Sequence, residues 1–428
     1  MTFEEVVLRL ERRAPGRWEL YRKTSLSRER ESAGPLSRVA HRREEGWAAR
    51  WWCGDPLAMR FAASSSAEGL AAAVQDASLL PAGPDVPPDW PKPRAAKESD
   101  PGDELPLEDP PDQTAALSAA IAAASSQKAS LSSLALRAGE IRERIANASG
   151  LDLAHALRVF DGVACASARG ASYAHAARAA FRWDPAAPGD VLAQPLAARL
   201  ADAAALPLSG RGAPFRAGQW LLEPPVAAAI VAAVSGAFCG PRGPGWIARE
   251  GAIAPAVRLV DDASRESPWD GEGVASRRMT LFESGEPVAR LFDLRSATAA
   301  GRTSTGHGVR PSFREPPRCG PRRIFFESSA AGAPSAESLA SSVRRGLVAR
   351  ALTAPVRADL AGDRYEVEFT GVSLAGGRET GPVAGARASG RISELLRRIE
   401  AASSGVEFFP IPFLAGSPTL LVERASFD

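Results

Sequence analysis

Histidine and cysteine are scarce in this chain of 428 residues, and their scarcity excludes several classes of protein. The chain contains only 4 histidines and 4 cysteines, and they are widely dispersed: His41, His155, His175, His307, Cys53, Cys165, Cys239 and Cys319. No two of them have the spacing of a local zinc finger, and the cysteines are too few for a disulfide-stapled scaffold. We therefore expect a reduced, cytoplasmic protein whose thiols are structural.

An excess of charge of one sign is also missing. The chain has 52 basic and 50 acidic residues and a formal net charge of +2. Its basic residues are almost all arginines, because only Lys23, Lys92, Lys97 and Lys128 are lysines. A nucleic-acid-binding protein usually carries a basic patch that neutralises phosphates. We expect no nucleic-acid partner.

Long hydrophobic runs are absent as well. No segment reaches the roughly 18 consecutive apolar residues of a membrane span, so no membrane partner is expected. Near the first residue, Phe3, Val6, Val7 and Leu10 have helical spacing, which predicts an amphipathic helix rather than a signal peptide.

The residues that follow predict an α+β unit. Alternating apolar positions indicate strands over 18–30, 37–43, 46–52 and 57–63, with turns at 34–35, 44–46 and 54–56. Ser66 is a candidate N-cap for a helix that reaches about Ala77. The fold class expected is thus α+β, with antiparallel strands and flanking helices.

Composition divides the chain into four segments. We predict an N-terminal α+β segment over 1–80, a proline-rich and acidic linker over 81–112, a central α+β segment over 113–208 that completes the N-terminal region, and a β-rich C-terminal domain over 209–428. The central segment is expected to contain helices at 113–126 and 187–205, and turns at 138–139 and 148–150. A docking ligand rich in proline is the alternative interpretation of 81–112.

The C-terminal domain carries the clearest local signals. Pro224 and Pro225 open a helix over 226–237 that is apolar on all sides and therefore buried. A hairpin over 277–294 turns on Ser284-Gly285. Further strands are expected at 219–222, 365–369 and 419–422, and a helix at 392–399.

No active site follows from the residues alone. Gly240–Gly245 lacks the context of a phosphate-binding loop, and Cys239 at a helix C-terminus favours an inert thiol. His307 stands on a turn, where a local hydrogen bond is the simpler interpretation. Four acidic residues suggest a cation-binding loop, although surface solvation is the favoured interpretation: Asp261, Asp262, Asp270 and Glu272.

Several segments, taken in order, resemble the PmbA/TldE branch of the TldD/PmbA family. These are Leu222–Ala229 with Val234–Gly240, the D-x-E-G-x-x-x-R-R stretch Asp270–Arg278, the hairpin Phe282–Gly285, the stretch Leu291–Ala297, the turn Ser304–His307 and the closing strand Gly416–Val422. The resemblance implies an N-terminal α+β region followed by a β-rich, metalloprotease-like domain with a buried helix.

The same resemblance bears on catalysis. TldD-type subunits carry H-E-x-x-x-H on the matching helix and a later cysteine, which supply the zinc ligands and a general base. Ala232, Ala233 and Ala237 stand at those positions here, and no cysteine follows Cys319. The resemblance thus implies that this chain holds no cofactor and is not catalytic by itself, and that zinc belongs to a partner.

The implied role is a TldE/PmbA-like subunit of a heterodimer. It would pair with a TldD-type zinc metallopeptidase and help bind unfolded peptides, or the precursor of a peptide natural product, for proteolysis. Gly306, His307, Arg277 and Arg278 are the candidate residues of a peptide groove. Two alternatives stay open: a stand-alone hydrolase whose active site is relocated to His307 and the acidic residues, and a binding or modulator protein related to gyrase.

Overall fold

The computed structural model describes residues 1–33, 36–53, 58–76, 87–92, 130–169, 174–182, 213–248, 251–410 and 413–427. The expected turns at 34–35 and 54–56, the helices at 113–126 and 187–205 and most of the 81–112 segment lie outside these residues. Strands outnumber helices and form one large sheet and two smaller ones, so the expected α+β class is confirmed. None of the helices in the described ranges is long and apolar enough to cross a membrane.

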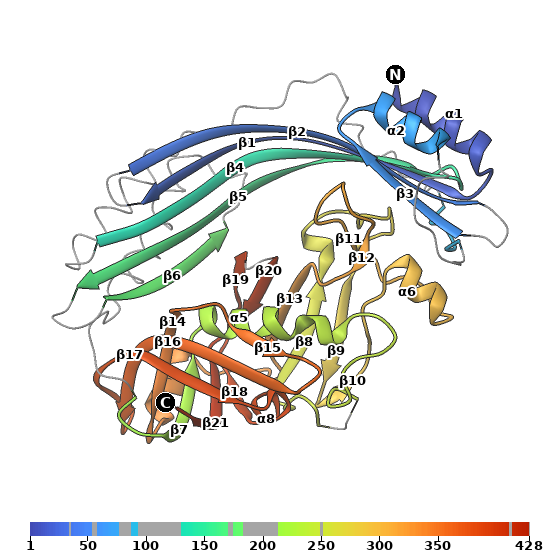
Figure 1. Cartoon of the computed structure of the whole chain (residues 1–428). Coiled ribbons are helices and arrows are strands. Elements are labelled where there is room, and N and C mark those ends of the chain that lie inside the picture. Colours follow the sequence, from blue (N-terminus) through green and yellow to red (C-terminus); the bar gives the residue numbers. More distant parts are fainter. Residues whose placement is uncertain are drawn as a thin grey trace.

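The N-terminal half is a sheet of long antiparallel strands. Their order is β6-β5-β4-β1-β2-β3, and their bounds are β1 Trp18–Ala33, β2 Leu36–Cys53, β3 Ala58–Ser64, β4 Ser130–Asn147, β5 Asp152–Arg169 and β6 Ala174–Arg182. In Figure 1 this sheet curves as an arch over the C-terminal half of the chain. The backbone of β6 joins it to β14 (Arg345–Leu352) through the pair Leu352–Arg178.

Two helices cover one end of the arch. The helix α1 spans Phe3–Arg13 and begins with a capping box, in which Thr2 and Glu5 satisfy each other's backbone N–H groups. The helix α2 spans Ala67–Gln75 and has the expected N-cap Ser66. Their apolar faces pack on β1 and β2, so the expected helices are confirmed.

Two glycines that were expected to mark turns lie inside strands instead. Residues 44–46 continue β2, because β1 pairs with it along its whole length and a Cβ on Gly46 would lie 2.1 Å from the Phe313 ring. Residues 138–139 continue β4, where a Cβ on Gly139 would lie 2.5 Å from the Leu26 carbonyl oxygen. Both glycines provide room for a neighbour, so the predicted turns are wrong. The turn expected at 148–150 is confirmed.

The large sheet continues into the C-terminal half and closes on itself there. The strands β7 (Ala217–Leu222), β14, β16 (Arg364–Ala375) and β17 (Arg378–Gly390) pair in that order, and β7 also pairs with β21 (Leu420–Ser426). A bridge between Ala388 and Phe427 returns β17 to the end of β21. Trp220, Phe369 and Phe427 contact one another in the interior. Two short strands extend the sheet: β15 Arg357–Asp359 and β18 Ile399–Ala402.

A second sheet packs beside it in the order β10-β9-β8-β13-β20-β19. Its bounds are β8 Val257–Asp262, β9 Arg278–Glu283, β10 Glu286–Pro287, β13 Arg323–Ser328, β19 Glu407–Pro410 and β20 Leu414–Ser417. The hairpin β9–β10 turns on Ser284-Gly285 as expected. The remaining elements are α6 Leu294–Ala299, α7 Ala336–Ser342, α8 Ile392–Arg397, the pair β11 Gly308–Val309 and β12 Arg318–Cys319, and the one-turn helix η3 Ala263–Arg265.

The apolar helix lies between the two sheets. It is α5, Pro224–Val234, and it contacts β13, β19 and β20 on one side and β14 and β15 on the other (Figure 1). The two prolines occupy its first positions, as predicted. It is shorter than the expected 226–237, because its last turn tightens into the 3₁₀ helix η2, Ser235–Phe238.

Candidate functional site

The end of α5 is the first candidate site, because it corresponds to the place where TldD-type subunits are expected to hold zinc. Ala232 and Ala233 are half-buried, and Ala237 is 1% exposed. Ala232 and Ala237 belong to the largest hydrophobic cluster of the described residues. The three positions present methyl groups, which neither bind a metal nor transfer a proton.

The polar groups around this helix end satisfy backbone carbonyls. Arg290 donates hydrogen bonds to the carbonyl oxygens of Ala237, Cys239 and Gly240 at 2.6–3.0 Å. The Cys319 thiol donates to the Leu291 carbonyl oxygen at 3.1 Å. Helix ends leave unpaired carbonyls, so these contacts stabilise the α5–η2 terminus.

The residues present do not fit a zinc ion. A structural zinc site needs four ligands and a catalytic one needs three protein ligands. Across the described ranges, no group of three or more histidine, cysteine or acidic residues could hold a metal ion. The helix end therefore offers a packed apolar surface and two thiols, Cys239 and Cys319.

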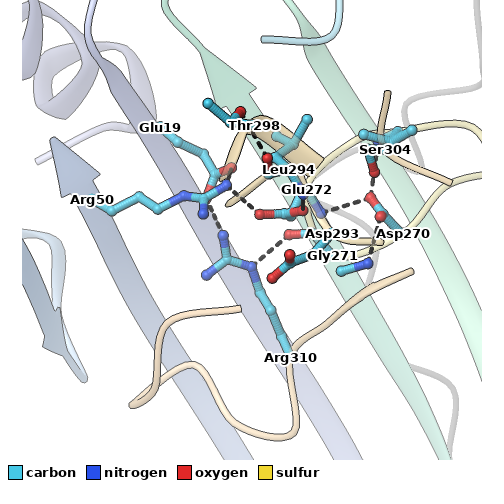
Figure 2. Close-up of polar contacts among 12 residues, drawn as sticks. Glu19, Arg50, Asp270, Gly271, Glu272, Asp293, Leu294, Thr298, Ser304 and Arg310 are labelled. Carbon is cyan, nitrogen blue, oxygen red and sulfur yellow. Dashed lines mark hydrogen bonds and ion pairs between the residues drawn. The ribbon is translucent and has the colours of Figure 1, made fainter. Parts of the chain in front are cut away.

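A buried charged cluster is the second candidate site, and it joins the arch to the C-terminal half (Figure 2). Glu19 on β1 and Arg50 on β2 are cross-strand partners, and the guanidinium donates to both carboxylate oxygens at 3.1 and 2.8 Å. Arg50 also donates to Glu272 of the C-terminal half at 2.7 Å. These three side chains are at most 3% exposed, so one arginine binds two carboxylates away from water.

Arg310 makes a second bridge in the same cluster. It forms an ion pair with Glu19, and its Nε donates to the Gly271 carbonyl oxygen at 2.6 Å. Its guanidinium lies 4.6 Å from the centre of the Tyr21 ring on β1. Arg310 thus contacts two residues of the arch from the loop that follows β11.

The carboxylates of the loop 270–272 are held by backbone donors. Asp270 accepts hydrogen bonds from the backbone N–H groups of Glu272, Val274 and Gly308 at 2.7–2.9 Å. Glu272 accepts one from Leu294 N at 2.6 Å, at the start of α6. Segments far apart in the sequence are joined in this way into one rigid loop cluster.

Aromatic rings cover the cluster. The Arg50 guanidinium lies 5.8 Å from the Trp52 ring and 5.4 Å from the Trp90 ring. Trp90 belongs to the segment that was expected to be a linker, yet it is 7% exposed and packs edge-on against Trp52. Pro91 accepts a hydrogen bond from Asn147 Nδ2 at 3.0 Å. Residues 87–92 therefore cover the charged cluster at the interface between the arch and the C-terminal half.

Burial sets the protonation of the cluster. The two carboxylates beside Arg50 raise its pKa and hold it charged, although burial acts against the charge. Burial raises the pKa of Glu272 to about 8, and Asp270, Asp293 and Glu19 act in the same direction against Arg50. Burial also raises the pKa of Asp270. The cluster is enclosed and internally paired, which suits a joint between two parts of the molecule better than a site open to substrate.

Comparison with models of known protein families identifies the C-terminal part of the chain. The family model of the PmbA/TldA metallopeptidase C-terminal domain matches residues 248–428. This match assigns the C-terminal part of the chain, residues 248–428, to that domain family. The expected family resemblance is confirmed, and the matched residues contain both the loop 270–272 and the turn 304–307. The search of curated proteins finds no match.

Solved structures share the fold over the whole chain. TldE from Thermococcus kodakarensis superposes with a TM-score of 0.80 at 17% identity, covering 99% of both chains. A candidate modulator of a DNA gyrase from Thermotoga maritima has a TM-score of 0.75 at 16% identity, covering 100% of both. A similarly named protein from Bacteroides thetaiotaomicron has 0.70 at 14%, covering 99% of this chain and 97% of that one. At these identities the likeness concerns the fold.

The four acidic residues of the predicted cation-binding loop are buried rather than solvated, so the favoured surface interpretation is wrong. Asp261, Asp262, Asp270 and Glu272 are all buried. Asp261 lies at the end of β8 and accepts hydrogen bonds from Arg322 N and Arg323 N at 2.9 and 3.2 Å. The carboxylates hold neighbouring chain segments together, which accounts for their burial.

The predicted groove residues separate into a buried and an exposed pair. Gly306 and His307 are buried; His307 Nδ1 contacts Thr305, and its Nε2 lies 3.3 Å from Asp261 Oδ1. Arg277 and Arg278 are exposed; Arg277 donates to the Ser304 carbonyl oxygen at 2.6 Å and Arg278 donates to Glu327 at 2.8 Å. Their assignment to a peptide groove stays a prediction.

Glu19, Arg50 and Arg310 were not predicted from the sequence as residues of a site. The signal lies in β2, where Trp47, Ala49 and Trp51 form one face and the opposite face is apolar as well, with Arg50 in its middle. An arginine inside a strand that is apolar on both faces needs a buried partner. The partner Glu19 lies in β1 between Trp18 and Leu20, in the same kind of surroundings.

Proposed function

We propose that this chain is a non-catalytic, TldE-type subunit that pairs with a TldD-type zinc metallopeptidase. One observation carries the proposal. The helix end at which TldD-type subunits hold zinc is built here from Ala232, Ala233 and Ala237, of which Ala237 is fully packed. A zinc peptidase needs ligands and a base at those positions, so the chemistry must come from another chain.

The overall likeness supports the pairing part of the proposal. The structure of TldE from Thermococcus kodakarensis superposes over 99% of both chains. The chain thus keeps the whole architecture of a TldE, including the arch, and has not been reduced to a remnant of the C-terminal domain. In the proposal the partner holds the zinc, and this subunit contributes to the chamber in which an unfolded peptide is cleaved.

Peptide binding is the second part of the proposal. An extended peptide can add to the edge of a sheet through backbone hydrogen bonds, which accept many sequences.

Metal analysis and co-purification test the subunit role. The full chain, expressed alone, is expected to contain less than about a tenth of an equivalent of zinc and to show no peptidase activity. Co-expression with a TldD-type subunit from the same genome is expected to give one complex on size exclusion, with about one zinc per pair. One equivalent of zinc on the isolated chain, or failure to associate with the TldD-type subunit, would contradict the proposal.

Hydrogen exchange tests peptide binding. In the complex, addition of a reduced, unfolded polypeptide is expected to slow exchange of the amides of one segment of this subunit, because a new strand would pair with them. Unchanged exchange throughout this subunit would contradict its part in peptide binding.

Neither alternative gains support from a specific observation. His307 and Asp261 are both 0% exposed, so a relocated active site at this pair would have no access for substrate. The names of two structural neighbours refer to a DNA gyrase, and that statement concerns those proteins. This chain has a net charge of +2, and a protein that binds DNA directly usually needs a larger basic excess.

A further inference from the structure

Two cysteines that are far apart in the sequence meet beside Leu291. Cys239 follows η2 and forms a parallel bridge with Leu291, in which Gly240 N donates to the Leu291 carbonyl oxygen at 2.8 Å. Cys319 ends β12, and its thiol donates to the same oxygen at 3.1 Å. One carbonyl group therefore anchors both cysteine-bearing segments, and the two thiols interact electrostatically.

The surroundings of the two sulfurs allow reaction. Both cysteines are half-buried, so a small oxidant can reach them, whereas neither projects freely into solvent. The Arg290 guanidinium interacts electrostatically with both sulfurs and favours a thiolate. Contact with Cys319 and burial raise the pKa of the Cys239 thiol.

We propose that Cys239 and Cys319 form a reversible disulfide when the protein meets hydrogen peroxide. The Cys319 thiolate attacks one peroxide oxygen, the O–O bond breaks, and the departing oxygen leaves as water after taking up a proton. The resulting sulfenic acid is attacked by the Cys239 sulfur, and its hydroxyl leaves as water with the Cys239 proton. In total, two thiols and one peroxide give one disulfide and two waters.

The disulfide would act on a specific part of the fold. It would connect the end of η2, directly after the alanine positions of the α5 terminus, to the pair β11–β12, whose first strand follows His307. A bond that closes a long loop stabilises the folded chain, so the oxidised form should unfold at a higher temperature. This inference goes beyond the proposed function, because it requires neither a TldD-type partner nor zinc.

Peptide mapping of the full chain tests the inference. After hydrogen peroxide treatment and alkylation of remaining thiols, a linked peptide pair containing Cys239 and Cys319 is expected, lighter by two hydrogen atoms than the reduced pair. Dithiothreitol should reverse the link, and the oxidised form should melt several degrees higher. The substitution Cys319→Ser should abolish the link, while Cys53→Ser, which changes another half-buried cysteine, should leave it intact.

The wild-type chain alone decides the result if a variant fails to fold. Oxidation of Cys239 or Cys319 to separate sulfinic acids, with no linked peptide, would overturn the inference. A link from either residue to Cys53 or Cys165 would overturn it too. The inference would also be overturned if both thiols stayed free after a peroxide treatment strong enough to oxidise the methionines.

Discussion

The end of α5 and the junction around Arg50 make opposite use of polar side chains. At the helix end, Ala232, Ala233 and Ala237 are apolar, and the polar groups nearby serve backbone carbonyls. At the junction, Arg50 binds two buried carboxylates from different parts of the chain. At the junction, buried charged groups connect two parts of the fold. At the helix end, the three alanine side chains carry no group that could bind a metal.

This contrast separates two requirements of a family member. Under the proposed function, a subunit that docks on a catalytic partner needs its arch and its C-terminal domain in a fixed arrangement, and a buried ionic cluster provides that geometry. Under the same proposal, it does not need ligands for a metal that the partner supplies. Substitutions in one region or the other, each compared with a matched position, can break or sharpen the contrast.

The largest expected effect is the loss of Arg50. Replacing Arg50 by Ala leaves Glu272 buried without its cationic partner and leaves Glu19 with Arg310 alone, which should lower the free energy of unfolding by about 3–5 kcal/mol. The exposed Arg278, which binds Glu327 with two hydrogen bonds, is the control and should cost at most about 1 kcal/mol when changed to Ala. Urea unfolding of both variants measures the difference; equal losses would show that the junction is no stronger than a surface pair.

A second effect is a fall in stability with rising pH that belongs to Glu272. Its pKa is raised by burial from 4.5 to about 8 in the folded protein. Between these values the folded chain holds a proton that the unfolded chain has released, so the free energy of unfolding decreases as pH rises from about 5 to 8. The expected slope is of the order of 1 kcal/mol per pH unit.

The variant Glu272→Gln isolates that contribution, because Gln keeps the size of the side chain and removes the ionisation. Unfolding at several pH values between about 5 and 8 should give a flatter profile for the variant than for the wild-type chain. Parallel profiles would show that Glu272 stays ionised beside Arg50 across the range.

A third effect sharpens the contrast at α5. The substitution Ala237→His introduces a large polar ring at a position that is 1% exposed, and it should cost about 1–3 kcal/mol through overpacking and an unpaired ring nitrogen. Ala233→His places the same ring at a half-buried position of α5, just before η2, and should cost less. Thermal unfolding of both variants tests this order. If Ala237→His is tolerated without loss, packing does not exclude a ligand at this position.

The sequence was sufficient for elements whose signals are local. The apolar spacing of α1, the N-cap of α2, the prolines that begin α5 and the hairpin on Ser284-Gly285 lie within a few residues of the structure they determine. The turns predicted at Gly46 and Gly139 were wrong. Those glycines leave space for Phe313 and for the Leu26 backbone, which lie far away in the sequence. Local patterns cannot distinguish a glycine that turns the chain from one that makes room for a neighbour.

The junction around Arg50 could not be predicted from local sequence patterns either. Asp270, Glu272 and His307 were singled out in the sequence, but the burial of Glu272 depends on the arch, whose Arg50 lies 222 residues earlier in the chain. A cluster of acidic residues was therefore interpreted as solvated. The family pattern identified the right segments because it preserves their order, and the fold then supplied the contacts.

The smallest effect concerns the turn that meets the 270–276 loop. Gly306 has φ of +77°, and a Cβ there would lie 2.5 Å from the Ala275 carbonyl oxygen; Gly301 has φ of +60° and open space around it. Changing either to Ala costs roughly 1 kcal/mol for the left-handed backbone. Gly306→Ala should cost roughly 1 kcal/mol more, because Ala275 must move. If urea unfolding gives equal losses for both variants, the close approach of the two loops does not contribute to the stability of the junction.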